Sequence, residues 1–476
     1  MKRMNSRSIR WMAALTGVCG AIAMSASAAA AAPVVGHSTG ALPDGGTWIA
    51  DVPAHWNGTL LLYSHGYGPP VAQDMSDPAT QNALLGMGYA MAGSSYDPSG
   101  PWWALGSAVR DQFETESVVA RTVLKAKPSK VYAVGTSMGG LVSALEDQGA
   151  AGRINGSLTT CGLVAGANQL NQYQLDGEYA IAQLLAPNEH IQLTNFTVGP
   201  PTFSDSAASA AELDSAISSA QTTAQGRARL ALAFAFLNVS PWGGSTQPGV
   251  DDFLAQEQGQ YDGYTSTLFG GPLTPIDFIV EGRDQIEAAA GGEGAGTVGV
   301  DFGRLLRQSS YYPEVKALYD AAGLRLVNDL SSLTSHATLV PDRAARRWLT
   351  RSSVPTGHLQ VPELDIHTIS DPLIPVQQER YYANLVHRAG DARLLRQAFV
   401  AAQGHCAFTP AELIAGLQAL QSRVRTGRWA NVATPDALNA AANSLPSGLG
   451  GGAYTPFWPE RLTGAPSPKT SGRAAR

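Results

Sequence analysis

Residues 131–139 read VYAVGTSMG and decide the fold. The apolar run at their start predicts a buried strand, and residues 141–148 have the pattern of a helix. Between the two lies G-x-S-x-G, the pattern of a sharp strand-to-helix turn that lifts a nucleophilic serine above a sheet edge. Gly135 and Gly139 suit this turn, because a Cβ at either position would collide with a neighbouring strand or helix. We therefore predict a nucleophile at Ser137; a glycine-rich turn with a capping serine is the alternative.

The composition is typical of a large globular protein with more than one folded unit. The chain has 476 residues, of which 44% are hydrophobic and 15% charged, and its formal net charge is −6. A nucleic-acid partner would require a basic face, so this charge balance predicts none.

The first 32 residues have the pattern of an export signal. Basic residues at positions 2, 3, 7 and 10 precede an apolar centre at 11–24 and a zone of small residues at 26–32. We expect a secreted mature chain, extracellular or periplasmic, with lipid attachment at Cys19 as the alternative to simple cleavage. No other stretch reaches the roughly 18 apolar residues that a bilayer requires, so we expect no stable membrane insertion.

Two cysteines, Cys161 and Cys406, remain once the export signal is removed. In an oxidising compartment the pair favours a single disulfide. Two free buried thiols are the alternative.

The order of the expected elements divides the rest of the chain. Residues 33–164 and 356–445 alternate strands and helices, which predicts a mostly parallel sheet flanked by helices. Residues 165–355 contain Ala-rich helical stretches instead, and an insertion of about 190 residues is too long for a loop and must fold by itself. We interpret it as a mainly helical cap, or lid. Residues 446–476 form a tail rich in Gly, Pro and Ser, and we expect its last dozen residues to be disordered.

The serine pattern also predicts where its partners lie. A serine hydroxyl needs a base within hydrogen-bond reach, and the base needs an orienting carboxylate. With this elbow the chain order is serine, acid, histidine. Asp371 follows the strand expected at 363–369, and His405 follows the strand expected at 394–400. We therefore predict Asp371 as the acid and His405 as the base.

Rival carboxylates exist. Asp284 follows the apolar residues 278–280, and Asp365 lies within a strand pattern. Asp371 could also do no more than cap the helix that follows it.

Negative charge that develops on a substrate oxygen needs hydrogen-bond donors, each worth about 3 kcal/mol. The first is expected to be the backbone N–H of Met138, directly after the serine. The second is expected from Tyr67, in the turn HGYG at residues 65–68 after a predicted strand. His65 is expected to support this turn. Trp102 and Trp103 could line an aromatic substrate pocket or serve packing alone.

Together these motifs resemble the α/β-hydrolase superfamily, and in particular secreted bacterial serine hydrolases with a large cap, including feruloyl-esterase and tannase-like enzymes. The resemblance covers about residues 60–110, 130–162 and 360–410, and it implies the α/β-hydrolase fold with a lid insertion. His405 and Cys406 are similar to the tannase-like pattern, in which the cysteine after the catalytic histidine is disulfide-bonded beside the nucleophile. That pattern has a cysteine where this chain has Thr136, and the resemblance implies that Cys161 replaces it as the partner of Cys406.

The favoured function is that of a secreted serine esterase that cleaves a carboxylic ester through an acyl-enzyme, with no cofactor or metal. An amidase or exopeptidase with the same triad is the first alternative, and Glu281, Asp284 and Glu287 could then anchor a chain terminus. A non-catalytic binding protein is the second. The expected partner is therefore a small-molecule ester or amide.

Overall fold

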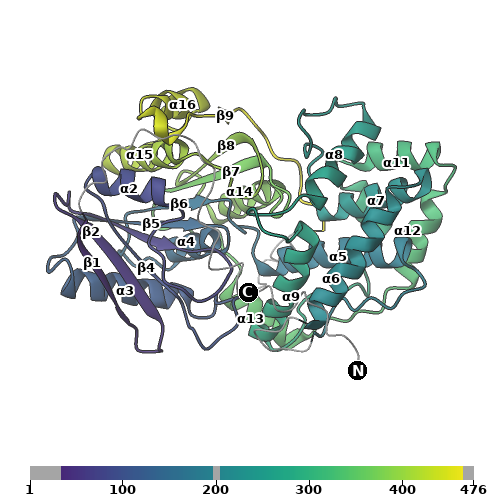
Figure 1. Ribbon diagram of the computed structural model, residues 1–476, viewed down its shortest axis with the longest axis horizontal. Coiled ribbons are helices and arrows are strands. Elements are labelled where there is room, and N and C mark those ends of the chain that lie inside the picture. The colour runs from purple at the N-terminus through teal and green to yellow at the C-terminus, as the bar shows by residue number, and fades with distance from the viewer. Residues whose placement is uncertain (1–33, 197–203, 465–476) are drawn as a thin grey trace, which may run out of the picture.

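The computed structural model describes residues 34–196 and 204–464, and in these residues nine strands form one sheet (Figure 1). The expected export signal and the last dozen residues lie outside the described residues. The strand order is β1-β2-β4-β3-β5-β6-β7-β8-β9. The strands are β1 (Val34–Ala41), β2 (Thr47–Pro53), β3 (Thr59–Ser64), β4 (Ala90–Ser94), β5 (Lys130–Thr136), β6 (Gly156–Thr160), β7 (Glu363–Ser370), β8 (Leu395–Gln403) and β9 (Tyr454–Thr455).

The sheet is mostly parallel, as predicted. The six neighbours from β4 to β8 run in one direction, whereas β2 is antiparallel to β1 and β4, and β9 is antiparallel to β8. Parallel strands place all their carboxyl ends at one edge of the sheet. The loops after β3, β5, β6, β7 and β8 therefore meet there.

Helices cover both faces of this sheet because its inner strands are apolar on both faces. Alternate residues of β3 face opposite sides: Leu61 packs in the core beneath α2 and α15, and Leu62 packs in the core beneath α3. The flanking helices are α2 (Pro78–Gly86), α3 (Ala108–Thr122), α4 (Met138–Gln148), α14 (Gln377–Ala389), α15 (Pro410–Thr426) and α16 (Pro435–Asn443).

Between β6 and β7 the described residues form helices without a strand, and these helices lie beside the sheet in Figure 1. We call residues 165–355 the insertion. Its helices are α5 (Ala167–Leu185), α6 (Ser204–Ala220), α7 (Ala224–Leu237), α8 (Phe253–Thr265), α9 (Pro275–Ala290), α10 (Phe302–Arg307), α11 (Tyr312–Ala321), α12 (Leu326–Ser335) and α13 (Arg343–Ser352).

The centre of the insertion is α7, whose residues from Leu230 to Leu237 are all buried. A helix that is apolar on every side must be surrounded by others, and α7 packs against α5, α6 and α11. Within the described part of the chain, none of the helices combines the length and the apolar character of a membrane span.

A buried cation joins two helices of the insertion. Arg283 on α9 has no exposed surface, and its guanidinium forms ion pairs with Glu178 of α5 at 2.9 Å and with Glu293 at 3.3 Å. The same guanidinium donates to the side chain of Asn171. A buried charge is tolerated only when it is paired and hydrogen-bonded, and these partners satisfy that condition.

The sequence pattern predicts neither β1 nor β9. The strand β1 contains two glycines and lies at the edge of the sheet that the described residues form, where it pairs with β2. The strand β9 is two residues long and lies in the tail, where a short 3₁₀ helix, η1 (Ser447–Leu449), precedes it. Pairing with β8 orders this part of the tail, because Ala401 donates to the carbonyl of Ala453.

Candidate active site

The strand-to-helix turn after β5 carries Ser137 in a strained conformation. Its φ is 59° and its ψ is −123°, in a region that residues with a side chain rarely adopt. Glycine is required on both sides. A Cβ on Gly135 would lie 1.9 Å from the carbonyl oxygen of Gly139, and a Cβ on Gly139 would lie 1.8 Å from that of Ser64. The sharp turn predicted from the sequence is therefore present, and it leaves Ser137 half-buried at the edge of the sheet.

Three loops at this edge bring the predicted serine, acid and base together. The Oγ of Ser137 lies 2.8 Å from Nε2 of His405, and Nδ1 of His405 lies 2.6 Å from Oδ2 of Asp371. These residues follow β5, β8 and β7, and 268 residues separate the serine from the histidine. With Nδ1–H donating to the carboxylate, Nε2 is left free to accept the serine proton.

Asp371 is held by its own loop. Its Oδ1 accepts hydrogen bonds from the backbone amides of Leu373 at 2.9 Å and Ile374 at 2.8 Å. Burial alone would raise the pKa of this carboxyl, but its electrostatic interactions and hydrogen bonds with His405 and His367 outweigh burial and hold the pKa well below the usual range. Asp371 is therefore ionised at any ordinary pH. These two amides lie before α14, whose N-cap is Val376 and has no side-chain hydrogen bond, so Asp371 does not cap that helix.

The rival carboxylates lie elsewhere. Asp284, on α9, accepts a hydrogen bond from Ser206 at 3.0 Å. Asp365, on β7, accepts one from Gln397 at 3.2 Å. Of the three acids, only Asp371 bonds to His405 in the described structure.

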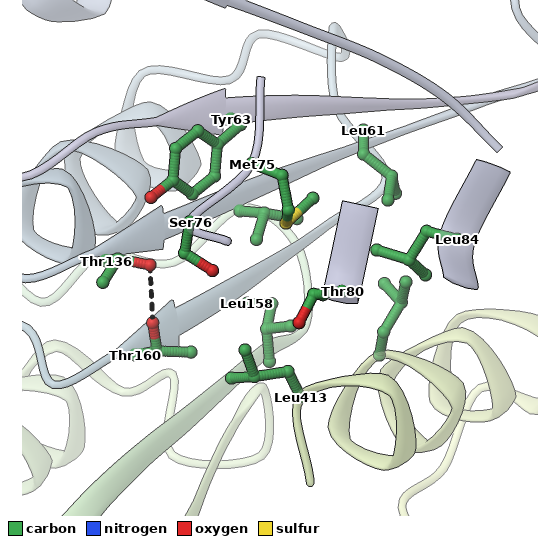
Figure 2. A pocket seen from close by; sticks show the side chains of 12 residues that line it. Leu61, Tyr63, Met75, Ser76, Thr80, Leu84, Thr136, Leu158, Thr160 and Leu413 are labelled. Carbon is green, nitrogen blue, oxygen red and sulfur yellow. Dashed lines mark hydrogen bonds between the residues drawn. The ribbon is translucent and has the colours of Figure 1, made fainter. Parts of the chain in front are cut away.

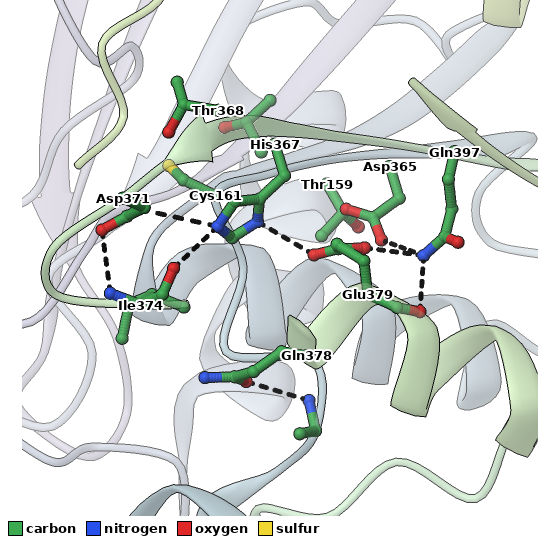
Figure 3. A network of polar contacts seen from close by, with 12 residues as sticks. Thr159, Cys161, Asp365, His367, Thr368, Asp371, Ile374, Gln378, Glu379 and Gln397 are labelled. Atoms are coloured by element: carbon green, nitrogen blue, oxygen red, sulfur yellow. Dashed lines mark hydrogen bonds and ion pairs between the residues drawn. The ribbon is translucent and has the colours of Figure 1, made fainter. Parts of the chain in front are cut away.

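A second histidine lies behind Asp371, and the sequence analysis did not single it out (Figure 3). His367, on β7, has no exposed surface. Its Nδ1 lies 2.9 Å from Glu379, and its Nε2 lies 2.9 Å from the carbonyl of Ile374 and 3.6 Å from Asp371. Both nitrogens face acceptors, so both carry a proton and the ring is cationic.

The pKa of His367 reflects these neighbours. Burial lowers it, but the carboxylates of Asp371 and Glu379 outweigh burial and raise it to about 10. A signal was present in the sequence: a histidine lies four positions before the predicted acid, inside a strand expected to be buried. A buried histidine is usually structural, so spacing alone could not assign it this place.

The turn after β3 lies against the serine. A Cβ added to Gly66 would approach Cβ of Ser137 to 3.3 Å, and Tyr67 lines the pocket beside the serine. His65 supports this turn, as expected: its Nδ1 lies 2.7 Å from the carbonyl of Gly66, and its ring stacks on Tyr96 at 4.2 Å. Burial lowers the pKa of His65 to about 4, so its ring is neutral and serves as packing.

A disulfide joins Cys161 and Cys406, with their Cα atoms 5.3 Å apart. Cys161 follows β6, where its backbone amide donates to the carbonyl of Ile366, and Cys406 directly follows His405. The bond therefore fastens the histidine loop to the edge of the sheet. The two sulfur atoms and His405 lie within 4.8 Å of one another, but disulfide sulfurs offer no thiolate to a metal.

A pocket opens beside Ser137, between the sheet edge and the insertion. It contains about 390 Å³ of empty space, part of it open to solvent. It is lined by Tyr67, Trp103, Ser137, Leu163, Leu170, Gln174, Phe278, Ile279, Gly282, Ile286, Leu373 and Ile374.

The two tryptophans have different places. Trp103 is buried and lies in the pocket wall. Trp102 is not part of that wall; its ring meets the ring of Tyr67 edge-on at 5.8 Å, and its backbone amide donates to Gln285. The pocket expectation therefore fits Trp103, whereas Trp102 packs behind Tyr67.

A second cavity, of about 340 Å³, lies in the core beneath α2 and α15 (Figure 2). Its lining is mostly apolar, and the hydroxyls of Thr136 and Thr160 at its end bond to each other at 3.1 Å. Ser137 is not part of the lining. We regard this cavity as loose core packing.

The known proteins to which this chain is similar include an amidase, an esterase and a peptidase. No family model matches the chain. It is 28% identical over 435 residues to o-phthalyl amidase of Xanthobacter agilis, with 86% of this chain and 91% of that protein covered. The rice cell wall degrading esterase LipA from Xanthomonas oryzae is 16% identical, with a TM-score of 0.35 and coverage of 80% of this chain and 85% of that one. The acylaminoacyl peptidase of Pyrococcus horikoshii is 10% identical, with a TM-score of 0.34 and coverage of 78% and 37%.

These TM-scores are low, so the assignment of the fold rests on features of this chain itself. The sheet is mostly parallel, a G-x-S-x-G elbow follows β5, and a turn after β3 lies against its serine. Acid and histidine follow in the order that this elbow requires. The chain therefore has the α/β-hydrolase fold.

Proposed function

We propose that this hydrolase cleaves a carboxylic ester through an acyl-enzyme formed on Ser137. One observation carries the proposal: an unbroken chain of two hydrogen bonds runs from Ser137 through His405 to Asp371. A buried carboxylate that is always ionised keeps the histidine in the tautomer that can accept a proton.

The chemistry follows from this order. Nε2 of His405 takes the proton of the serine hydroxyl as Oγ attacks the substrate carbonyl. The resulting imidazolium, stabilised by Asp371, returns the proton to the leaving alcohol. Water then repeats the sequence, with His405 as its base, and releases the acid. The tetrahedral intermediates place their negative charge at the backbone amides of Met138 and Tyr67, each worth about 3 kcal/mol.

The proposal includes export of the protein from the cytosol. The basic and apolar segments of residues 1–32 form a signal of the secretory type, and a disulfide that holds the histidine loop suits an extracellular or periplasmic enzyme. Reduction in the cytosol would release the loop that carries His405.

The insertion is proposed to act as a lid that supplies specificity. Four residues of α9 form one wall of the pocket, opposite the loops of the sheet edge: Phe278, Ile279, Gly282 and Ile286. Sites between two folded units are where small ligands commonly bind.

Amide hydrolysis is the second candidate, and the similarity to an amidase over most of both chains favours it. The same serine and histidine can perform it, provided that His405 protonates the departing nitrogen. An exopeptidase is not favoured. Glu287 accepts the backbone amides of Asn195 and Phe196, and burial, together with Asp277 and Asp284, raises the pKa of Glu281 to about 9. Neither glutamate offers a free carboxylate to a chain terminus.

A fluorophosphonate probe tests the mechanism, and chromogenic substrates test the bond. The purified mature chain should be labelled on Ser137, and Ser137→Ala should abolish labelling. Turnover of p-nitrophenyl esters should exceed that of the matching p-nitroanilides. Turnover of anilides alone would replace the ester by the amide, and an unmutated chain that resists the probe would favour a non-catalytic binding protein.

A further inference from the structure

We propose that Gly282 is a specificity-determining residue: it leaves a notch in the pocket wall that receives the flat aromatic ring of the substrate's acyl group. The inference rests on the proposed function, since it concerns the group that Ser137 would carry in the acyl-enzyme. It narrows the substrate class to derivatives of uncharged aromatic carboxylic acids.

The first observation is a glycine that helix packing does not explain. Gly282 lies in the middle of α9, where glycine destabilises a helix more than any residue except proline. A Cβ added there would meet nothing within 4 Å. Two other helix glycines are explained by close approach, because a Cβ on Gly177 would lie 2.2 Å from Leu237 and a Cβ on Gly416 would lie 2.5 Å from Ile366.

The second observation is where the unused space lies. Gly282 lines the same pocket as Ser137. Residues three and four apart lie on one face of a helix, so Phe278, Gly282 and Ile286 form one stripe on α9. The helix therefore presents a large side chain one turn before and one turn after the glycine. Between them the wall is recessed to the backbone.

The walls of this notch suit a flat ring. The aromatic rings of Phe278 and Tyr67 meet edge-on at 5.4 Å, and Trp103 lies in the same wall. Aromatic groups prefer such edge and offset contacts. None of the described residues that line the pocket is charged. A charged group would lose its hydration there without gaining a partner, so the ring is expected to be uncharged.

The pocket belongs to the acyl side of the substrate. His405, which would protonate the leaving group, is not among the residues that line the pocket. Its ring instead meets Phe269 edge-on at 5.9 Å, and Phe269 is 52% exposed. The leaving group would therefore depart over His405 toward solvent, while the group that stays on Ser137 lies against α9.

The test compares two p-nitrophenyl esters that share a leaving group, the benzoate and the acetate. Wild-type enzyme should turn over both. Gly282→Ala should lower the benzoate-to-acetate ratio of kcat/KM at least tenfold, and Gly282→Leu should lower it further. The melting temperature of Gly282→Ala should be unchanged or higher, because alanine favours the helix.

Gly303→Ala is the matched control. Gly303 lies in α10, outside the pocket lining, and an added Cβ there meets nothing closer than 3.4 Å. This variant should leave the ester ratio unchanged. An unchanged ratio in both Gly282 variants would overturn the inference, as would a wild-type enzyme that cleaves the acetate but not the benzoate. Failure to cleave either ester, with no labelling by the fluorophosphonate, would instead overturn the proposed function and the inference with it.

Discussion

The sheet edge around Ser137 and the helical insertion beside it differ in their backbone strain and in the contacts that hold them. At the edge, Ser137, Cys161 and Cys406 have φ values of 59°, 45° and 57°, in the left-handed region. The insertion is held by an apolar central helix, α7, and by the buried ion pairs of Arg283. Strained backbone persists only where its surroundings force it. Substitutions at the edge should therefore change the rate of reaction, and substitutions of the buried residues that hold the insertion together should change the stability.

The largest expected effect is at the edge. Ser137→Ala should lower kcat by about 10⁵-fold or more, because the nucleophile and its base act as a unit. The melting temperature should hardly change, since the variant loses a half-buried hydroxyl and leaves no cavity. Steady-state kinetics and a thermal melt measure the two quantities. Ser422→Ala on α15 is the control and should keep full activity; substantial turnover by Ser137→Ala would contradict the assignment.

The insertion should show the reverse. Arg283→Met would leave Glu178 and Glu293 buried without their cation, and unfolding free energy should fall by about 3–5 kcal/mol. Chemical denaturation measures this loss. Lys316→Met removes a surface ion pair with Asp320 on α11 and should produce no measurable change. If Arg283→Met is as stable as Lys316→Met and the wild type, the buried ion pairs do not hold the insertion together.

Removal of the disulfide should lower both the rate of reaction and the stability, because the bond lies at the sheet edge and joins residues 245 positions apart. The double variant Cys161→Ala, Cys406→Ala should lose about 2–4 kcal/mol of stability. Its kcat should fall as well, because the loop of His405 is no longer fastened to the sheet. Denaturation and kinetics on the same preparation test both. Normal kcat with lowered stability would show that the loop holds its shape without the bond.

The same comparison explains what the sequence could predict. The sheet could be predicted because its strands have visible local patterns. Ser137, Asp371 and His405 could be predicted because each lies directly after one of these strands. The pocket wall could not, since tertiary packing alone brings α9 over Ser137. Trp102 illustrates what sequence cannot predict: it is adjacent to Trp103 in the chain, yet of the two only Trp103 lines the pocket. His367 was missed because a histidine inside a buried strand carries no local sign of its partners.

His367 offers the smallest and most specific effect, on the pH dependence of stability. Its raised pKa means that the folded state binds one more proton than the unfolded state between an ordinary histidine pKa of about 6.5 and its folded value of about 10. Stability contributed by this group is complete below the lower value and is lost as the pH rises through the upper one. The carboxylates that face it are Asp371 and Glu379, and Asp365 bonds to the same Gln397 as Glu379.

In His367→Gln the histidine's share of this decline should disappear. The wild type should lose stability between pH 7 and pH 10 by at most about 1.4 kcal/mol per pH unit from this one group, and the variant should decline less steeply. Denaturant melts at several pH values measure the slope. His358→Gln is the control, because His358 is an exposed histidine that lies 3.5 Å from Asp391, and its slope should match the wild type. Equal slopes in His367→Gln and the wild type would mean that His367 is neutral in the folded protein.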